Sequence, residues 1–290
     1  MKTKSICRST AFAAAVFLFV PSALFAAQGS GRIEFQAHIA PTGGRPEPVR
    51  QMTFYLLSKS MEDIRSEALQ LEPAPDFDKF VDGIKESPEL KTWMKKHRSV
   101  DLAGTDFTKS LTPEEIVDVP EFFDAYMSRN AGFKGVGFPK PKYKEKDKEA
   151  DPEKYKLARE AYLAAIRKFI GTVPESVDGL DVDLTEKNRS AKWQQLVDAH
   201  KQRLDSRTTE IAQRRYLIRQ ADTNLEGEGS FAGLAPGDYW ISMVGIEAIS
   251  GDVRLRWNLP VSVRLGEISR VELSNINAEI SNTSAQISSH

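Results

Sequence analysis

The sequence predicts an α+β protein in which an antiparallel β-sandwich is interrupted by a large α-helical insertion. Apolar and polar residues alternate with a period of two near both ends of the chain, as in half-buried strands. Between about residues 60 and 220, apolar residues instead recur at spacings of three and four, as in amphipathic helices. The two early strands are too few to fold alone, so we expect them to share one sandwich with the later strands.

The chain begins with the features of a cleavable secretory signal peptide. Three basic side chains, Lys2, Lys4 and Arg8, precede a wholly apolar run at residues 11–20. A proline and small residues follow, which completes the charged, apolar and cleavable order of such a signal. We expect cleavage after Ala26 and export to the periplasm or out of the cell. The apolar run is about half of the roughly 20 residues that a membrane helix needs, and no comparable run occurs later.

Composition narrows the functions open to the mature protein. The single cysteine, Cys7, precedes the apolar run, so it leaves with the signal and cannot carry a lipid anchor. Of the 40 basic residues, three lie in the signal, which leaves 37 against 41 acidic residues and a net charge of −4. Nucleic-acid binding is disfavoured, because there is no basic excess to neutralise phosphates.

Two strands are expected before the helices. Residues 31–40 place Ile33, Phe35 and further apolar residues on one face and polar residues on the other. A stretch rich in proline and glycine follows, and residues 49–57 then form the second strand. Together they predict a hairpin with an irregular connection.

The middle of the chain predicts two long helices. Residues 151–171 carry an apolar stripe, with Asp151 as the N-cap and a proline at the first helical position. A second helix should run from Ser190 to about Arg219, because apolar residues recur on one side of it. Shorter helices are expected at about 60–71, 76–85, 87–97 and 119–129.

Strand patterns return after the helices. They cover residues 238–244, 252–259, 261–265 and 268–273, between glycine, proline, asparagine and aspartate turns. The expected organisation is a signal peptide at 1–26, the first part of the sandwich at 27–59, the helical insertion at 60–220, the second part of the sandwich at 221–280 and a flexible tail at 281–290.

The segment TNLEGEGSFAGLAPGDYWISM, residues 223–243, resembles the carboxypeptidase regulatory-like, or prealbumin-like, β-sandwich family. The matching positions are Thr223, Gly229, Phe231, Gly233, Leu234, Pro236, Gly237 and Tyr239. Residues 44–57 are similar to the early region of that family. The resemblance implies a prealbumin-like sandwich and no catalytic role, and it does not cover the insertion.

No motif in the sequence indicates catalysis, a cofactor or a metal. The four histidines are His38, His97, His200 and His290, and none is paired at the spacing of a helical zinc site. His200 lies on the apolar side of the second long helix and is expected to be a packing residue. We therefore predict no enzymatic activity.

One acidic loop could hold a calcium ion through its carboxylates. Its residues are Asp178, Asp181, Asp183 and Glu186. Their spacing does not match a helix-loop-helix calcium site, so a solvated turn or helix cap is the favoured interpretation. The mixed-charge run at residues 139–149 is expected to be a solvated loop.

A candidate ligand or partner surface lies on the last strands. Apolar residues alternate with Arg254 and Arg256, which therefore share one face, and Arg264 faces the same way if the next strand pairs with theirs. Beside Trp240, these arginines could recognise an acidic sugar or a partner loop. A solvated sheet face, with the arginines paired to nearby glutamates, is the favoured alternative.

The sequence as a whole indicates a non-enzymatic exported binding or assembly module of the bacterial cell envelope. In this hypothesis the sandwich presents the helical insertion to an envelope protein, without any cofactor. One alternative is a carbohydrate-binding module that uses Trp240 as a stacking platform for a polysaccharide. A second alternative is a hydrolase with its site at the junction of insertion and sandwich.

Overall fold

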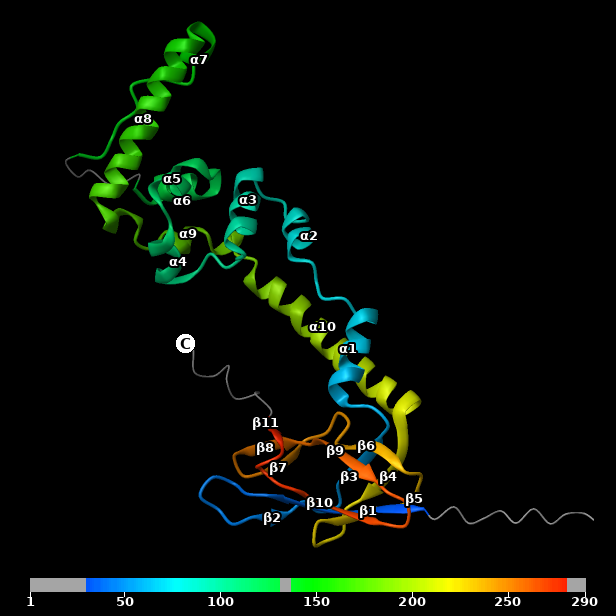
Figure 1. The fold of residues 1–290 in the computed structure, drawn as a ribbon. Coiled ribbons are helices and arrows are strands. Elements are labelled where there is room, and N and C mark those ends of the chain that lie inside the picture. Colours follow the sequence, from blue (N-terminus) through cyan, green and yellow to red (C-terminus); the bar gives the residue numbers. More distant parts are fainter. Residues whose placement is uncertain (1–29, 131–136, 281–290) are drawn as a thin grey trace, which may run out of the picture. The chain divides into compact units, whose positions relative to one another are not determined.

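The computed structural model describes residues 30–130 and 137–280, so the expected signal peptide and the expected tail lie outside the described residues. The chain divides into two compact units. Among the described residues, the sandwich unit holds 30–56, Arg219–Ile241 and 248–280, and the helical unit holds 57–130, 137–218 and Ser242–Glu247. Figure 1 shows the strands of the first and the helices of the second.

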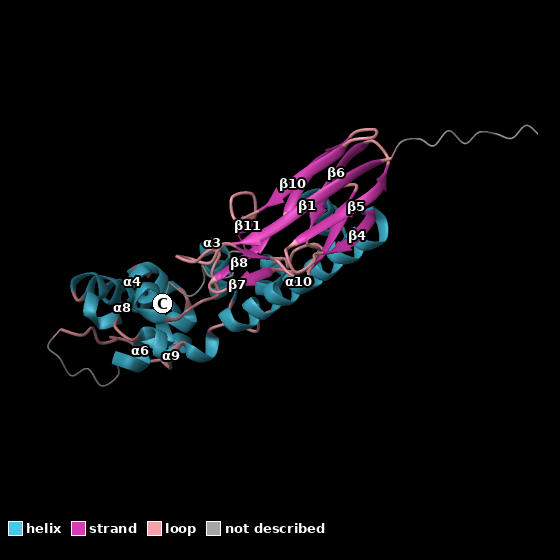
Figure 2. Ribbon diagram, turned by 90° about the horizontal axis from the view of Figure 1, so that it is seen from below, coloured by secondary structure: helices cyan, strands magenta, loops and turns pink. Residues whose placement is uncertain are grey.

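Three sheets make up the sandwich unit. The strands are β1 (Gly31–Ile39), β2 (Glu47–Pro48), β3 (Thr53–Leu57), β4 (Leu217–Asp222), β5 (Glu228–Leu234), β6 (Gly237–Ser242), β7 (Ala248–Ser250), β8 (Val253–Arg256), β9 (Asn258–Val263), β10 (Ile268–Leu273) and β11 (Glu279–Ile280). One sheet has β1 between β5 and β10, with β2 pairing to the end of β1, and the others have the orders β4-β3-β6-β9 and β11-β8-β7. Figure 2 shows β5, β1 and β10 side by side.

The core of the sandwich lies between the sheets. Along β1 the buried and less buried positions alternate as predicted, and Phe35 points inward. Its ring centroid lies 5.0 Å from that of Phe54 on β3 and 5.2 Å from that of Phe231 on β5. Trp257 lies 6.0 Å from Phe54, ring to ring. The predicted class, an α+β protein with a β-sandwich and a helical insertion, is confirmed.

Pairing in the central sheet joins the two ends of the chain. β1 is antiparallel to β5, with Phe35 opposite Gly229. It is parallel to β10, with Glu34 opposite Arg270. The parallel pair was not expected from the sequence, because alternation within a strand fixes which face is buried but carries no information about the direction of a distant partner.

The breaks between the last strands differ from the prediction. Residues 252–259 were expected to be one strand, with a turn at Pro260, but β8 ends at Arg256 and β9 continues through Pro260. The chain breaks at Trp257 because its side chain is buried and its indole Nε1 donates to the carbonyl of Ser274 at 3.0 Å. Proline is tolerated within β9, which is the outer strand of its sheet.

The helical unit has a hydrophobic core of its own. Its helices are α1 (Met61–Leu71), α2 (Phe77–Asp82), α3 (Pro88–His97), α4 (Gly104–Ser110), α5 (Pro113–Asp118), α6 (Pro120–Asn130), α7 (Asp147–Ala150), α8 (Pro152–Thr172), α9 (Leu180–Asp183) and α10 (Ser190–Ile211). The buried residues of its main hydrophobic cluster lie between Phe77 and Leu184. Asp151 caps α8 as predicted, its side chain accepting from the backbone N–H of Lys154. None of the described helices is both long and apolar enough to cross a membrane.

The second long helix ends earlier than predicted. The α-helix stops at Ile211, a π-helical turn covers Ala212–Tyr216, and the chain then enters β4 at Leu217. The prediction of a helix to about Arg219 was wrong because Ile211 and Ile218 are seven residues apart and so fit the helical stripe. Pairing of β4 beside β3 overrides that local pattern.

Candidate functional site

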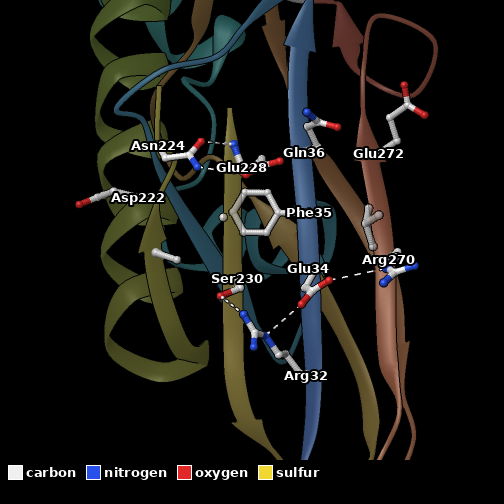
Figure 3. Close-up of a pocket in the computed structure, with 13 residues that line it drawn as sticks. Arg32, Glu34, Phe35, Gln36, Asp222, Asn224, Glu228, Ser230, Arg270 and Glu272 are labelled. Carbon is white, nitrogen blue, oxygen red and sulfur yellow. Dashed lines mark hydrogen bonds and ion pairs between the residues drawn. The ribbon is translucent and has the colours of Figure 1, made fainter. Parts of the chain in front are cut away.

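The candidate site is a concave, open face on the central sheet of the sandwich, with a volume of about 1010 Å³. Figure 3 shows it with β1 in blue between β5 and β10. Its lining residues come from four strands and one turn: Arg32, Glu34, Phe35, Gln36, Ala221, Asp222, Asn224, Glu228, Gly229, Ser230, Arg270, Val271 and Glu272. All of them belong to the sandwich unit.

Strand periodicity places the polar side chains of this face. Because side chains alternate along β1, Phe35 enters the core while Glu34 and Gln36 point to the outside. The two neighbouring strands then bring Ser230 and Arg270 to either side of Glu34. Residues almost 240 positions apart thus form one row across the sheet.

An arginine-rich half of the face is held by ion pairs. Glu34 lies between two arginines, with Oε1 3.4 Å from Nε of Arg32 and Oε2 3.6 Å from Nε of Arg270. Arg32 also donates from Nη2 to Oγ of Ser230 at 3.3 Å. Both arginines are well exposed, so these pairs orient the side chains and contribute little stability.

The other half of the face is acidic. Gln36 lies between Glu228 on β5 and Glu272 on β10, as Figure 3 shows. Asn224 donates from Nδ2 to Oε2 of Glu228 at 3.1 Å, and the side-chain oxygen of Asp222 accepts from the hydroxyl of Thr53 on β3 at 2.6 Å. No basic residue lines this half, so three carboxylates face solvent there.

Gly229 lets an apolar ring pack directly beneath the backbone of this face. Gly229 lies opposite Phe35, and a Cβ built on it would collide with Cζ of that ring. Only glycine lets the phenylalanine ring lie directly against the neighbouring backbone. The site is therefore a charged surface on a rigid apolar support, which suits a polar or charged partner better than an apolar ligand.

The predicted surface residues are distributed over two sheets. Arg254 and Arg256 lie at exposed positions of β8, in the β11-β8-β7 sheet. Trp240 is half-buried on β6, and Arg264 follows β9, in the β4-β3-β6-β9 sheet. The expected pairing between the strand of Arg254 and Arg256 and the strand before Arg264 was wrong, so that pairing does not place the four residues on one sheet face. Arg264 lies 4.0 Å from Glu267.

The acidic loop makes contacts within the helical unit. Asp181 accepts from the backbone N–H of Gly104 at 3.1 Å, and Asp183 lies 3.7 Å from Arg129. Asp178 accepts from the same arginine through its carbonyl at 2.5 Å. Over residues 30–130 and 137–280, no three histidine, cysteine or acidic residues are grouped so that they could hold a metal ion.

The histidine of the second long helix is a packing residue, as expected. His200 is buried, and its Nε2 donates to the carbonyl of Glu72 at the end of α1, at 2.9 Å. That contact joins α10 to α1.

Sequence reasoning did not find the concave face. The alternation of residues 31–40 already placed Glu34 and Gln36 on the polar side of a strand, and that was the available signal. The sequence does not show which strands flank β1, because the turn at Asn224 and the parallel strand β10 lie about 190 and 235 residues later in the chain.

No family model matches the chain, and no curated protein does. Among solved structures, two of the pilus backbone protein RrgB of Streptococcus pneumoniae are similar to it. One is 11% identical, with a TM-score of 0.22, and covers 85% of this chain and 41% of its own. The full-length major pilin is 8% identical, with a TM-score of 0.21, and the match covers 84% of this chain and 30% of the pilin. The chain thus spans less than half the length of these pilins.

Proposed function

We propose that this protein is an exported, non-enzymatic binding or assembly module of the bacterial cell envelope, whose β-sandwich presents the helical insertion to a protein partner. The observation that carries the proposal is the separate core of the insertion. Its buried residues come from α2 to α9 and from the turns between them. An insertion that folds around its own core can offer its outer surface to a partner.

Charged contacts hold the loops of the insertion in place. The carboxylate of Glu86, only 4% exposed, lies 2.9 Å from Nζ of Lys187 and 2.7 Å from Nη2 of Arg189. This cluster ties the segment before α3 to the segment before α10. The first segment is fixed again by Glu121, which accepts from the backbone N–H and the hydroxyl of Ser87 at 2.8 and 2.7 Å. A surface fixed in this way is preorganised for binding.

The sandwich belongs, in this proposal, to the carboxypeptidase regulatory-like type that residues 223–243 resemble. Thr223 is buried and donates from its hydroxyl to the carbonyl of Val49 at 2.6 Å, while Met52 donates its backbone N–H to the same hydroxyl at 3.1 Å. Tyr239 donates to the carbonyl of Ala235 at 2.9 Å, across the Pro-Gly turn. These contacts give structural roles to residues of the motif.

Export is proposed from the sequence of residues 1–26. Their order of basic, apolar and small residues is that of a secretory signal, and an envelope partner follows from that destination. Direct sequencing of the amino terminus of the protein recovered from the envelope would locate the cleavage, which we expect after Ala26.

Site-specific photocrosslinking in the envelope fraction tests the partner. A photoreactive amino acid replaces Leu157 on α8 or Val182 on α9, which are 66% and 64% exposed. Matched controls replace Ile249 and Leu265 of the sandwich, which are 57% and 59% exposed. We expect a discrete cross-linked protein from an insertion position and none from the controls. Cross-links from the sandwich alone, or from no position, would overturn the proposal.

A further inference from the structure

We propose that the partner is a second copy of this chain, and that a lysine strip on the insertion of one copy docks onto the concave sheet face of the next. The lysine strip consists of Lys140, Lys142 and Lys144. The inference rests on the proposed function, because it names the partner of that module. It follows from two surfaces of opposite charge that the same chain carries.

The lysine strip lies on an irregular segment that is held in place by aromatic side chains. Phe138, at one end, packs its ring 5.3 Å from that of Phe169 on α8. Tyr143, near the other end, packs 5.1 Å from Tyr155 and 5.9 Å from Tyr162, also on α8. The segment is therefore anchored at both ends, while residues 140–142 between the anchors are exposed, as expected of a solvated loop.

The three lysines between and beside these anchors are fully available. Lys140, Lys142 and Lys144 are all exposed, and none makes an ion pair with an acidic side chain in the part of the chain that the structure describes. Pro139 and Pro141 restrict the backbone around them, so docking would cost less conformational entropy than ordering a free chain. No acidic residue occurs from Gly137 to Lys144.

The acidic half of the concave face has the opposite charge and a compatible spacing. Glu228 and Glu272 flank Gln36 on neighbouring strands, so their backbones are two strand spacings, or about 10 Å, apart. The first and last lysines of the strip are four residues apart, which is at most about 12 Å in an extended chain, and the bend at Lys142 shortens that distance. Flexible lysine side chains can close the difference. Figure 3 shows Glu228 and Glu272 on either side of Gln36.

Contacts of this kind join two different surfaces. One copy uses its lysine strip and the other uses its sheet face, so each bound copy leaves one strip and one face free. Such a heterologous contact does not saturate at a dimer and extends to longer chains unless a ring closes. Because exposed ion pairs carry it, salt should weaken it.

Charge reversal on either surface tests the proposal in the full-length mature protein. The strip variant carries Lys140→Glu, Lys142→Glu and Lys144→Glu, and the face variant carries Glu228→Lys and Glu272→Lys. In sedimentation velocity at low ionic strength, the native protein should show a mass that grows with concentration. Each variant alone should lose association on the order of tenfold or more.

Mixing the variants distinguishes this contact from general charge effects. The strip variant keeps a native face and the face variant keeps a native strip, so the mixture should regain the association that each variant alone has lost. The reversed strip and the reversed face also have opposite charges, so the two variants should alternate in chains that grow with concentration. A protein with both surfaces reversed should regain self-association. The control, Lys154→Glu, Lys156→Glu and Lys168→Glu on the exposed side of α8, has the same charge change and should associate like the native protein.

Three results would overturn the inference. They are a native protein that stays monomeric at all concentrations in low salt, a mixture that does not associate, and a control that fails as completely as the strip variant. The photocrosslinking experiment separates this failure from that of the proposed function. A cross-linked product whose mass is that of a different protein would leave the binding module standing without self-assembly.

Discussion

Glu115 should be a strong electrostatic contributor to the stability of the helical unit. It forms a capping box with Thr112 at the start of α5, its carboxylate accepting from the backbone N–H at 3.1 Å. The same carboxylate lies 3.1 Å from Nζ of Lys96 and 2.8 Å from Nε2 of His97 on α3. With only 13% of its side chain exposed, it links two helices.

These contacts act on the pKa of Glu115. Burial by itself raises the pKa, but the donors from Thr112, Lys96 and His97 outweigh it and lower the pKa from 4.5 to about 2. A carboxyl whose pKa is depressed in the folded state adds stability above the unfolded pKa and loses it as the pH falls through the folded value. That shift is equivalent to at most about 3 kcal/mol, and solvent screening reduces it, so we expect roughly 1–3 kcal/mol at pH 7.

Urea denaturation of Glu115→Gln from pH 7 to pH 2 measures this effect, followed by tryptophan fluorescence and circular dichroism. The free energy of unfolding should be lower than that of the native protein at pH 7, and the difference should shrink between about pH 5 and pH 2. Glu114→Gln is the matched control, because its exposed neighbouring carboxylate makes none of these contacts. Our reasoning is refuted if both variants behave alike or if the difference does not change with pH.

Two further predictions concern packing and a buried charge. Gly229→Ala should lower the free energy of unfolding by about 1–3 kcal/mol, because the new Cβ would collide with the ring of Phe35. The control is Gly171→Ala, whose Cβ meets nothing within 4 Å and which should be neutral or stabilising. Thermal denaturation checks both, and equal melting temperatures would contradict the collision. Glu86→Ala leaves two cationic side chains without their buried partner and should lower the free energy of unfolding by about 3–5 kcal/mol. The control, Glu89→Ala, removes an exposed carboxylate and should lower it by less than about 0.5 kcal/mol. Urea denaturation of both variants measures the difference.

Much of the fold could be predicted because its signals are local. The cap at Asp151 and the apolar stripe after it define α8, and the alternation around Phe35 defines β1 and its buried face. The errors occur where a distant contact decides. Leu217 begins a strand because β3 lies beside it, and Trp257 ends one because Ser274 accepts its indole N–H. Local residue spacing reveals neither contact. At the first of them, the spacing of Ile211 and Ile218 even favours a helix.

The candidate site was harder to predict than the fold for a related reason. Each of its charged residues, taken singly, is a common polar residue on a strand. Glu34 becomes part of a site only when Arg270 arrives in parallel on one side and Ser230 in antiparallel on the other. The concave face is a property of strand order, and strand order over more than 200 residues is not encoded in any local pattern.

The position of the insertion explains how one chain accommodates both units. β3 and β4 are neighbours in one sheet, and next to their ends the backbone N–H of Ser58 donates to the carbonyl of Tyr216 at 2.9 Å. The insertion therefore occupies the place of a turn between two adjacent strands. Its length adds little to the entropy of closing that turn, because this cost grows only with the logarithm of loop length. The stability of the insertion must then come from its own core, which runs from Phe77 to Leu184. A change of surface residues on the insertion, such as the lysine strip, can thus alter binding without disturbing the sandwich.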